Sequence, residues 1–312
     1  MMFKNSLKLI TANFTTVWKL ILYYIIVCAL IVGLIYPVSG TLYEGLNAGG
    51  AVDSLFDCAT SLNASSHIFN LLQNLYVALT SIFSAFITLF STHTFVAIYS
   101  CFVVFYLMPF LFGLADLPVQ ETLYGYMSSL TRYGFLHCYI RKFGKSALFQ
   151  LFKDLIMLPI NCLLIYVFVQ ILSLTTLGGP IIYAIPFIVV IVMCILTTLK
   201  VTLFSGWIPA CVVYDCNMFV GLAKGFTAIF RRFWKSFSTV LMFMFCIFAV
   251  NYLFGTFAFI ITIPTSIMLL NIFGMVMFYG SQGMRYYVDL DTIVSPRKLE
   301  EKDEFRKIKN LI

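Results

Sequence analysis

Two short motifs in this chain have residue types that are used in phosphate chemistry. Asp289 and Asp291 form an Asp-x-Asp pair, but phosphatases of that kind place the pair in a Rossmann-like domain, and the tail 285–312 is too short for one. The stretch Gly144-Lys145-Ser146 resembles the end of a phosphate-binding loop, yet Tyr139 stands where that loop needs its first glycine. We therefore predict neither a phosphatase site nor a nucleotide site.

The other candidates for chemistry are cysteines, histidines and one carboxylate. Four residues separate Cys211 from Cys216, whereas structural zinc uses four ligands at closer spacing, so we interpret them as two buried thiols. The histidines have no second ligand or base beside them: His67, His93 and His137. We expect no catalytic residue, cofactor or metal. Asp215, in the apolar and aromatic segment 207–219, is the carboxylate whose substitution is most informative.

The composition is that of a membrane protein. Of 312 residues, 61% are hydrophobic and 11% are charged, whereas soluble domains are about 25% charged. The apolar residues lie in uncharged runs of about 20, the length that a helix needs to cross a bilayer. These runs do not alternate apolar and polar residues as barrel strands do. We therefore predict an all-α, polytopic transmembrane helical bundle that forms a single integral membrane domain over residues 1–312.

Six segments have the length and composition of a membrane span. The first follows several lysines and resembles a secretion signal, but it is too long and lacks a cleavage site, so we interpret it as a retained span. The predicted spans are 20–38, 91–113, 155–175, 180–199, 237–257 and 259–280.

Charge predicts how these spans are oriented. Every lysine and arginine lies before or at the start of the first span, between the second and third, between the fourth and fifth, or after the last. The opposite side holds Glu44, Asp53 and Asp57. Because positively charged loops stay in the cytoplasm, we predict a multi-pass membrane protein with both termini cytoplasmic and 285–312 as a charged tail.

The segment 67–90 is also apolar, with Ile68, Leu72 and Leu75 at helical spacing. One more span here would invert the basic loop 132–153 relative to the N-terminus. We therefore predict an outer interfacial helix or a tilted extension of the second span. A re-entrant hairpin is the alternative.

A basic motif occurs twice before a predicted span. The stretch 141–146 matches 231–236 at an offset of 90 residues. On a helix, Lys224, Arg231 and Lys235 share one face, and a series of phenylalanines occupies the opposite face.

A fainter third copy precedes the first span, so we predict parallel helical-hairpin repeats. The predicted repeat units are 1–115, 116–204 and 205–284.

The basic helices are predicted to lie on the inner leaflet, where their cationic faces contact anionic lipid headgroups. The cations concerned are Arg141, Lys142, Lys145, Lys224, Arg231, Arg232 and Lys235. A membrane-protein partner is the other expected contact, and nucleic acid is not expected. Within the last hairpin, Asn251 and Asn271 are predicted to hydrogen-bond to each other, because membrane helices tolerate Asn chiefly when it bonds another helix.

One region resembles known membrane proteins. The stretches Trp207-Ile208-Pro209-Ala210, Tyr214-Asp215 and 221–225, followed by the basic turn, are similar to a bacterial family of six-span integral membrane proteins of unknown function. They also resemble the membrane domain fused to some glycerophosphodiester phosphodiesterases. The resemblance covers about a third of the chain. It implies a bacterial plasma-membrane location and no activity.

Two functions remain open. No predicted span has a carboxylate at its centre, and ion-coupled transporters usually keep ionisable groups there. This favours a non-catalytic scaffold or accessory subunit of a membrane complex, which is our first expectation. Internal repeats and proline-containing spans favour the alternative, a transporter or a lipid-handling protein of the flippase or scramblase kind. An enzyme is not expected.

Overall fold

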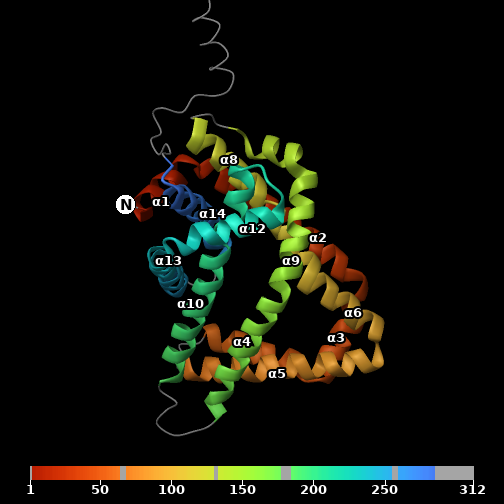
Figure 1. The fold of residues 1–312 in the computed structure, drawn as a ribbon. Helices are drawn as coiled ribbons and strands as arrows, with labels where there is room; N and C mark the ends of the chain where they lie inside the picture. Colours follow the sequence, from red (N-terminus) through yellow and green to blue (C-terminus); the bar gives the residue numbers. More distant parts are fainter. Residues whose placement is uncertain (1, 64–67, 130–132, 177–183, 255–258, 285–312) are drawn as a thin grey trace, which may run out of the picture. The chain divides into compact units, whose positions relative to one another are not determined.

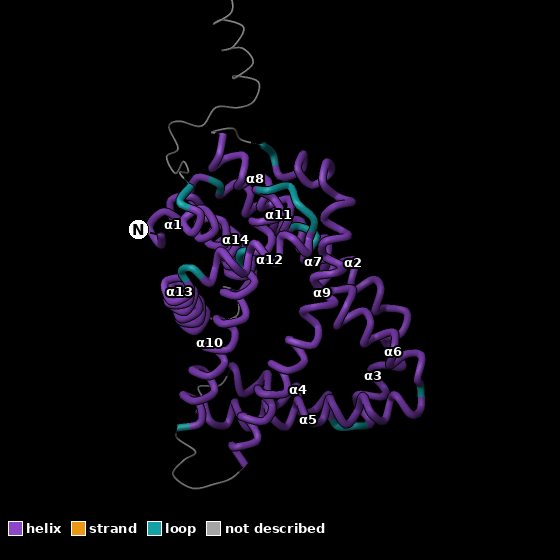
Figure 2. The backbone as a smooth tube through the Cα atoms, viewed as in Figure 1, coloured by secondary structure: helices purple, strands orange, loops and turns teal. Residues whose placement is uncertain are grey.

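The computed structural model describes residues 2–63, 68–129, 133–176, 184–254 and 259–284. Every regular element within these residues is a helix, and Figure 2 shows helices joined by short loops. The all-α prediction is therefore confirmed. The charged tail 285–312 lies outside the described residues.

The chain divides into two compact units, and several long helices run from one into the other. Unit 1 comprises residues 1–25, 112–151 and 198–312, and unit 2 comprises 26–111 and 152–197. All lysines and arginines except Lys153 fall in the ranges of unit 1. The division therefore follows charge. It divides the first two predicted repeat units, whereas the third, 205–284, falls wholly within unit 1.

Unit 1 contains the N-terminal helix, the helices that bear the basic motifs, and the last hairpin (Figure 1). Its main packed pair is α11 with α12, and α14 packs against both α1 and α8. The elements that lie in it wholly or in part are α1 (Met2–Ala12), α2 (Phe14–Ile35), α7 (Met108–Gly113), α8 (Asp116–Ser129), α9 (Phe135–Ser173), α10 (Ile185–Phe204), α11 (Trp207–Val213), α12 (Met218–Phe230), α13 (Phe233–Phe254) and α14 (Phe259–Gln282).

Unit 2 contains the remaining parts of α2, α7, α9 and α10, together with a group of lateral helices. Its main packed pair is α4 with α5, and α5 also packs against α3 and α6. The elements found only in unit 2 are η1 (Tyr36–Val38), α3 (Ser39–Ala48), α4 (Ala51–Asn63), α5 (Ile68–Thr92), α6 (Thr94–Phe102), the π-helix η2 (Val103–Leu107) and η3 (Leu174–Thr176).

Six helical segments of the described residues are long and apolar enough to cross a membrane, so the chain has the helices of a multi-pass membrane protein. Four contain or overlap the predicted first to fourth spans, and one matches the predicted sixth. The remaining one is Asn70–Thr92, which we predicted to be interfacial. The predicted fifth span, 237–257, lies largely in α13, whose fully described part, Phe233–Ile247, is shorter than a span.

The contacts of α5 favour a lateral position over a spanning one. Its N-terminal half, around Leu72, packs against Leu172 at the end of α9 and Ile185 at the start of α10. Its C-terminal half packs against α3, where a Cβ on Gly45 would meet Leu89. The N-terminal half of α5 therefore contacts the last turns of α9 and the start of α10, whereas its C-terminal half contacts α3, the helix that follows α2 and η1. A helix that spanned beside α9 would contact more of α9 than its last turns.

The two basic motifs fold differently, which corrects one prediction. The first lies within α9, whose 39 residues would extend ~58 Å at 1.5 Å per residue. At the second motif the helix is interrupted at Arg231 and Arg232, so Lys224 and Lys235 do not share a face of one helix. The chain turns there because Ile229 of α12 and Val240 of α13 enter the same core as Phe273 of α14. This tertiary packing overrides the local helix preference.

Candidate functional site

The candidate site in unit 1 is built around the turn that joins α11 to α12. Asp215 in this turn has a φ of +42°, a left-handed conformation that few residues other than glycine adopt. Aspartate and asparagine tolerate this conformation better than other side chains do. The turn follows Tyr214, the C-cap of α11, so the backbone reverses and α12 packs closely on α11.

Two lysines on α9 pair with the Asp215 carboxylate. Lys145 Nζ donates a hydrogen bond to Asp215 Oδ1. Lys142 Nζ lies 3.7 Å from the same oxygen. These residues are one turn apart on α9, so both ammonium groups reach the same carboxylate.

A second carboxylate completes the cluster. Arg141 Nη2 donates to Glu121 Oε1 of α8, and Lys142 Nζ lies 4.0 Å from that oxygen. Lys142 therefore lies between Glu121 and Asp215 and links α8, α9 and the α11–α12 turn. Glu121 was not predicted as a site residue, although it is one of few carboxylates between the predicted second and third spans. We call Glu121, Arg141, Lys142, Lys145 and Asp215 the charged cluster.

The lysines of the charged cluster act on the titration of Asp215. The hydrogen bond from Lys145 and the positive charges of Lys145 and Lys142 lower the pKa of the Asp215 carboxyl below its ordinary value. A carboxylate held ionised in this way is a poor proton acceptor near neutral pH. The side chain of Asp215 is 75% exposed and that of Glu121 is 14% exposed, so the Glu121 pairs are the better shielded from solvent. The arrangement joins three segments electrostatically.

Close backbone packing holds the turn in place. A Cβ on Gly225 of α12 would lie 2.7 Å from the carbonyl group of Gly206, so only glycine fits at this crossing. Trp207 is buried and donates its indole N–H to the backbone carbonyl of Met218 across 2.8 Å. Lys224 places its ammonium 4.1 Å from the centre of the Tyr214 ring, a cation–π contact.

Apart from Lys224, the remaining cations predicted to face lipid lie at the α12–α13 break and are not part of the charged cluster. Arg231, Arg232 and Lys235 are exposed at the α12–α13 break. Beside them runs a row of stacked rings that continues across the break, with neighbouring centroids 5.8–6.2 Å apart. The rings belong to Phe226, Phe230, Phe233 and Phe237, and Trp234, which is 79% exposed, packs edge-on against two of them. We call this surface the aromatic–basic row.

The two cysteines near the turn differ in exposure. Cys211 is buried, as predicted, and its sulfur occupies the space that a Cβ on Gly221 would need. Cys216 is only partly buried, and its sulfur lies 3.6 Å from the Ala210 carbonyl oxygen. Among the described residues, no three histidine, cysteine or carboxylate side chains are grouped as metal ligands.

Asn271 finds a partner other than the predicted one. Gln120 of α8 donates to the Asn271 side-chain oxygen across 2.9 Å and to its backbone carbonyl across 2.8 Å. Asn271 in turn donates to the Ile267 carbonyl of its own helix. Both amide residues are buried. The side chain of Asn251 lies outside the described residues, so the structure bears only on the Asn271 half of the prediction.

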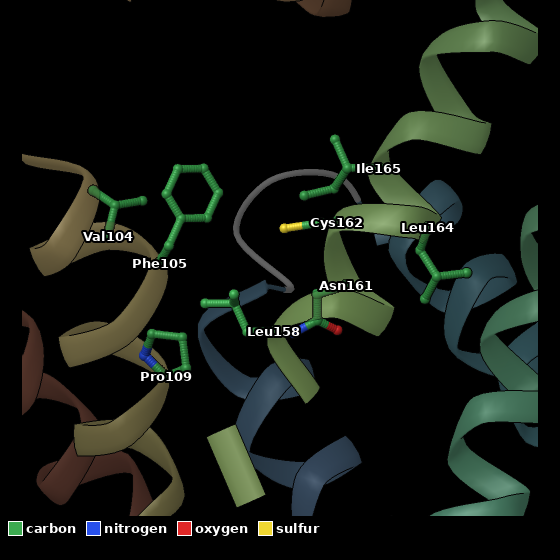
Figure 3. A pocket seen from close by; sticks show the side chains of 8 residues that line it. All are labelled: Val104, Phe105, Pro109, Leu158, Asn161, Cys162, Leu164 and Ile165. Carbon is green, nitrogen blue, oxygen red and sulfur yellow. The ribbon is translucent and has the colours of Figure 1, made fainter. Parts of the chain in front are cut away.

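Among the described residues of unit 2 lies a pocket with a volume of about 300 Å³. Figure 3 shows Val104, Phe105 and Pro109 facing Leu158, Cys162 and Ile165 across it, and the other labelled residues are Asn161 and Leu164. The first three belong to η2 and α7, and the others to α9. We call this pocket the unit 2 groove.

Comparison with protein-family models, with curated proteins and with solved structures gives no match.

Proposed function

We propose that this chain is a non-catalytic plasma-membrane protein that serves as a scaffold or accessory subunit of a bacterial membrane complex. One observation carries the proposal: the acidic and basic side chains of the charged cluster pair with one another. A transport path for charged substrates needs such groups within the membrane and available to the substrate. Groups that pair with one another instead fix the mutual positions of α8, α9 and the α11–α12 turn.

The proposed topology places both termini and the aromatic–basic row in the cytoplasm. Exposed aromatic rings beside Arg231, Arg232 and Lys235 are suited to the boundary between acyl chains and anionic headgroups. On this topology α3 and the C-terminal end of α9, which contact α5, face the exterior. The contacts of α5 therefore support an outer interfacial helix, as the charge distribution predicts.

Purification from native membranes tests the proposed role. The chain should be isolated in a mild detergent and in lipid nanodiscs, and its co-purifying proteins quantified. We expect a partner at fixed stoichiometry, and we expect the purified chain alone to transport nothing when reconstituted in liposomes. Isolation of the chain without any partner, together with solute flux or lipid scrambling in liposomes, would contradict the proposal.

The unit 2 groove favours a second candidate function, the handling of lipids. It is an apolar pocket between a segment with a π-helical turn and a proline-containing helix, and transporters place substrate sites at irregular helices. A liposome assay separates the two functions. Fluorescent phospholipid in the inner leaflet becomes accessible to an impermeant quencher only if the protein moves it across the bilayer.

A further inference from the structure

The helices on both sides of the unit 2 groove contain a proline, and one side also contains a π-helical turn. On one wall, η2 is a single turn of π-helix in which the Met108 N–H bonds the Val103 carbonyl, five residues back. Pro109 follows directly, and Pro159 lies within the opposite wall. Proline has no N–H to donate, and its ring displaces the preceding turn. The π-helical turn and Pro109 therefore make the wall formed by Val104, Phe105 and Pro109 depart from a regular helix surface beside the groove.

The groove opens on the surface of unit 2. Val104, Phe105 and Ile165 are 42%, 49% and 48% exposed, so their side chains form a rim as well as a wall. Apart from Asn161, the lining side chains are aliphatic, aromatic, proline or thiol. The lining residues fall in the predicted second and third spans, and such a rim there faces hydrocarbon.

The volume and the polarity of the unit 2 groove limit what can bind in it. A helix about 10 Å wide and four turns long fills more than ~1,000 Å³, whereas the groove holds about 300 Å³, so it admits a slender chain or single side chains and not a whole helix. Water needs two to four polar partners, and the lining offers one amide. A flexible hydrocarbon chain fits both the volume and the lining.

We propose that the unit 2 groove binds one acyl chain of a phospholipid from the surrounding bilayer. The chain lies between the π-helical wall of Val104 and Phe105 and the α9 wall of Leu158, Cys162 and Ile165. Its methylene groups pack against these side chains, as the side chains of a neighbouring helix do at a regular helix–helix contact. This inference goes beyond the proposed function, because a bound lipid fits a scaffold as well as a lipid transporter.

Native mass spectrometry of the full chain tests the proposal with a matched pair of variants. Ile165→Trp fills the groove, whereas Leu163→Trp adds the same ring at an exposed α9 position outside the lining. We expect one retained phospholipid per chain in the wild type and in Leu163→Trp, and loss of most of it in Ile165→Trp. No retained lipid in the wild type, or equal retention in the two variants, would overturn the proposal. A retained mass matching free fatty acid or detergent would refute a phospholipid source.

A fluorescence measurement decides the matter if Ile165→Trp does not fold. A bimane probe is attached to Cys162 in a chain whose other cysteines are replaced, and in a second chain to a cysteine that replaces Leu163. Both are titrated with phospholipids brominated on the acyl chain. Quenching at Cys162 should saturate at a several-fold lower mole fraction of brominated lipid than quenching at position 163. Proportional quenching at both positions would contradict a bound chain.

Discussion

Lys145 donates a hydrogen bond to Asp215 across 70 residues of sequence. The pair joins α9 to the α11–α12 turn, and Lys142 extends it to Glu121 of α8. α9 contributes three of the charged residues, and α8 and the α11–α12 turn contribute one each, so only the assembled unit places them within reach of one another. The charged cluster is therefore a consequence of the tertiary fold of unit 1, which its own pairs then support.

Substitutions at Asp215 should separate charge from backbone conformation. Asp215→Asn removes the charge but tolerates the left-handed φ, so it should destabilise by less than about 1 kcal/mol, the usual range for an exposed ion pair. Asp215→Val also introduces a β-branched side chain at positive φ, which should cost roughly 1–2 kcal/mol more. Unfolding of the purified protein in detergent, followed by circular dichroism, measures the order. Equal losses in the two variants would show that the strained φ is unimportant.

Stability should depend on pH through the Asp215 carboxyl. Its pKa in the folded protein is lowered by the hydrogen bond from Lys145 and the charges of Lys145 and Lys142. A lowered folded pKa means that the ionised form stabilises the fold at neutral pH, and that this contribution is lost as pH falls through the lowered value. The stability difference between wild type and Asp215→Asn should thus be constant near neutral pH and shrink in acid. A difference that grows on acidification would contradict the ion pair.

Glycine substitutions should distinguish the α11–α12 crossing from an open helix surface. Gly225→Ala places a Cβ 2.7 Å from the Gly206 carbonyl group, and such overpacking typically costs about 1–3 kcal/mol. Gly144→Ala, in α9, meets no atom within 4 Å and should stabilise its helix by about 0.5–1 kcal/mol. Thermal unfolding midpoints should therefore move in opposite directions. Equal shifts would mean that α11 and α12 are not closely packed.

The amide pair between α8 and α14 should show coupling in a double-mutant cycle. Gln120→Leu leaves the buried Asn271 oxygen without its donor and should cost about 1–2 kcal/mol. In Gln120→Leu/Asn271→Leu both polar groups are gone, so we expect the double variant to be more stable than additivity of the single variants requires. Strict additivity would show that the two amides do not interact.

The sequence predicted the helical class well because uncharged runs of span length leave few alternatives. It also placed Arg141, Lys142 and Lys145 on one helix, because that motif lies within the uninterrupted α9. The helix interruption at Arg231 and Arg232 was not predictable from local propensity. It depends on core contacts between α12, α13 and α14 that no short stretch of sequence reveals.

The partners within the charged cluster were equally beyond the sequence. Asp215 was singled out for its apolar surroundings, but its pairing with Lys145 depends on how the α11–α12 turn meets α9. The pairing of Glu121 with Arg141 could not be predicted because the two residues lie 20 positions apart and on different helices. Periodicity relates residues one or two turns apart, so it carries no information about pairs made between helices.

The central claim of the proposed topology is that the basic segments lie on the cytoplasmic side of the membrane and that α5 lies on its exterior surface. Cysteines placed singly at Asn70 and Thr92, near the two ends of α5, and at Trp234 in the aromatic–basic row would test it in a chain without other cysteines. Intact cells are treated with a charged, impermeant maleimide. We predict that the cysteines at positions 70 and 92 are both labelled and that the one at position 234 is labelled only after the cells are opened. Labelling of only one end of α5, or of position 234 in intact cells, would contradict the account.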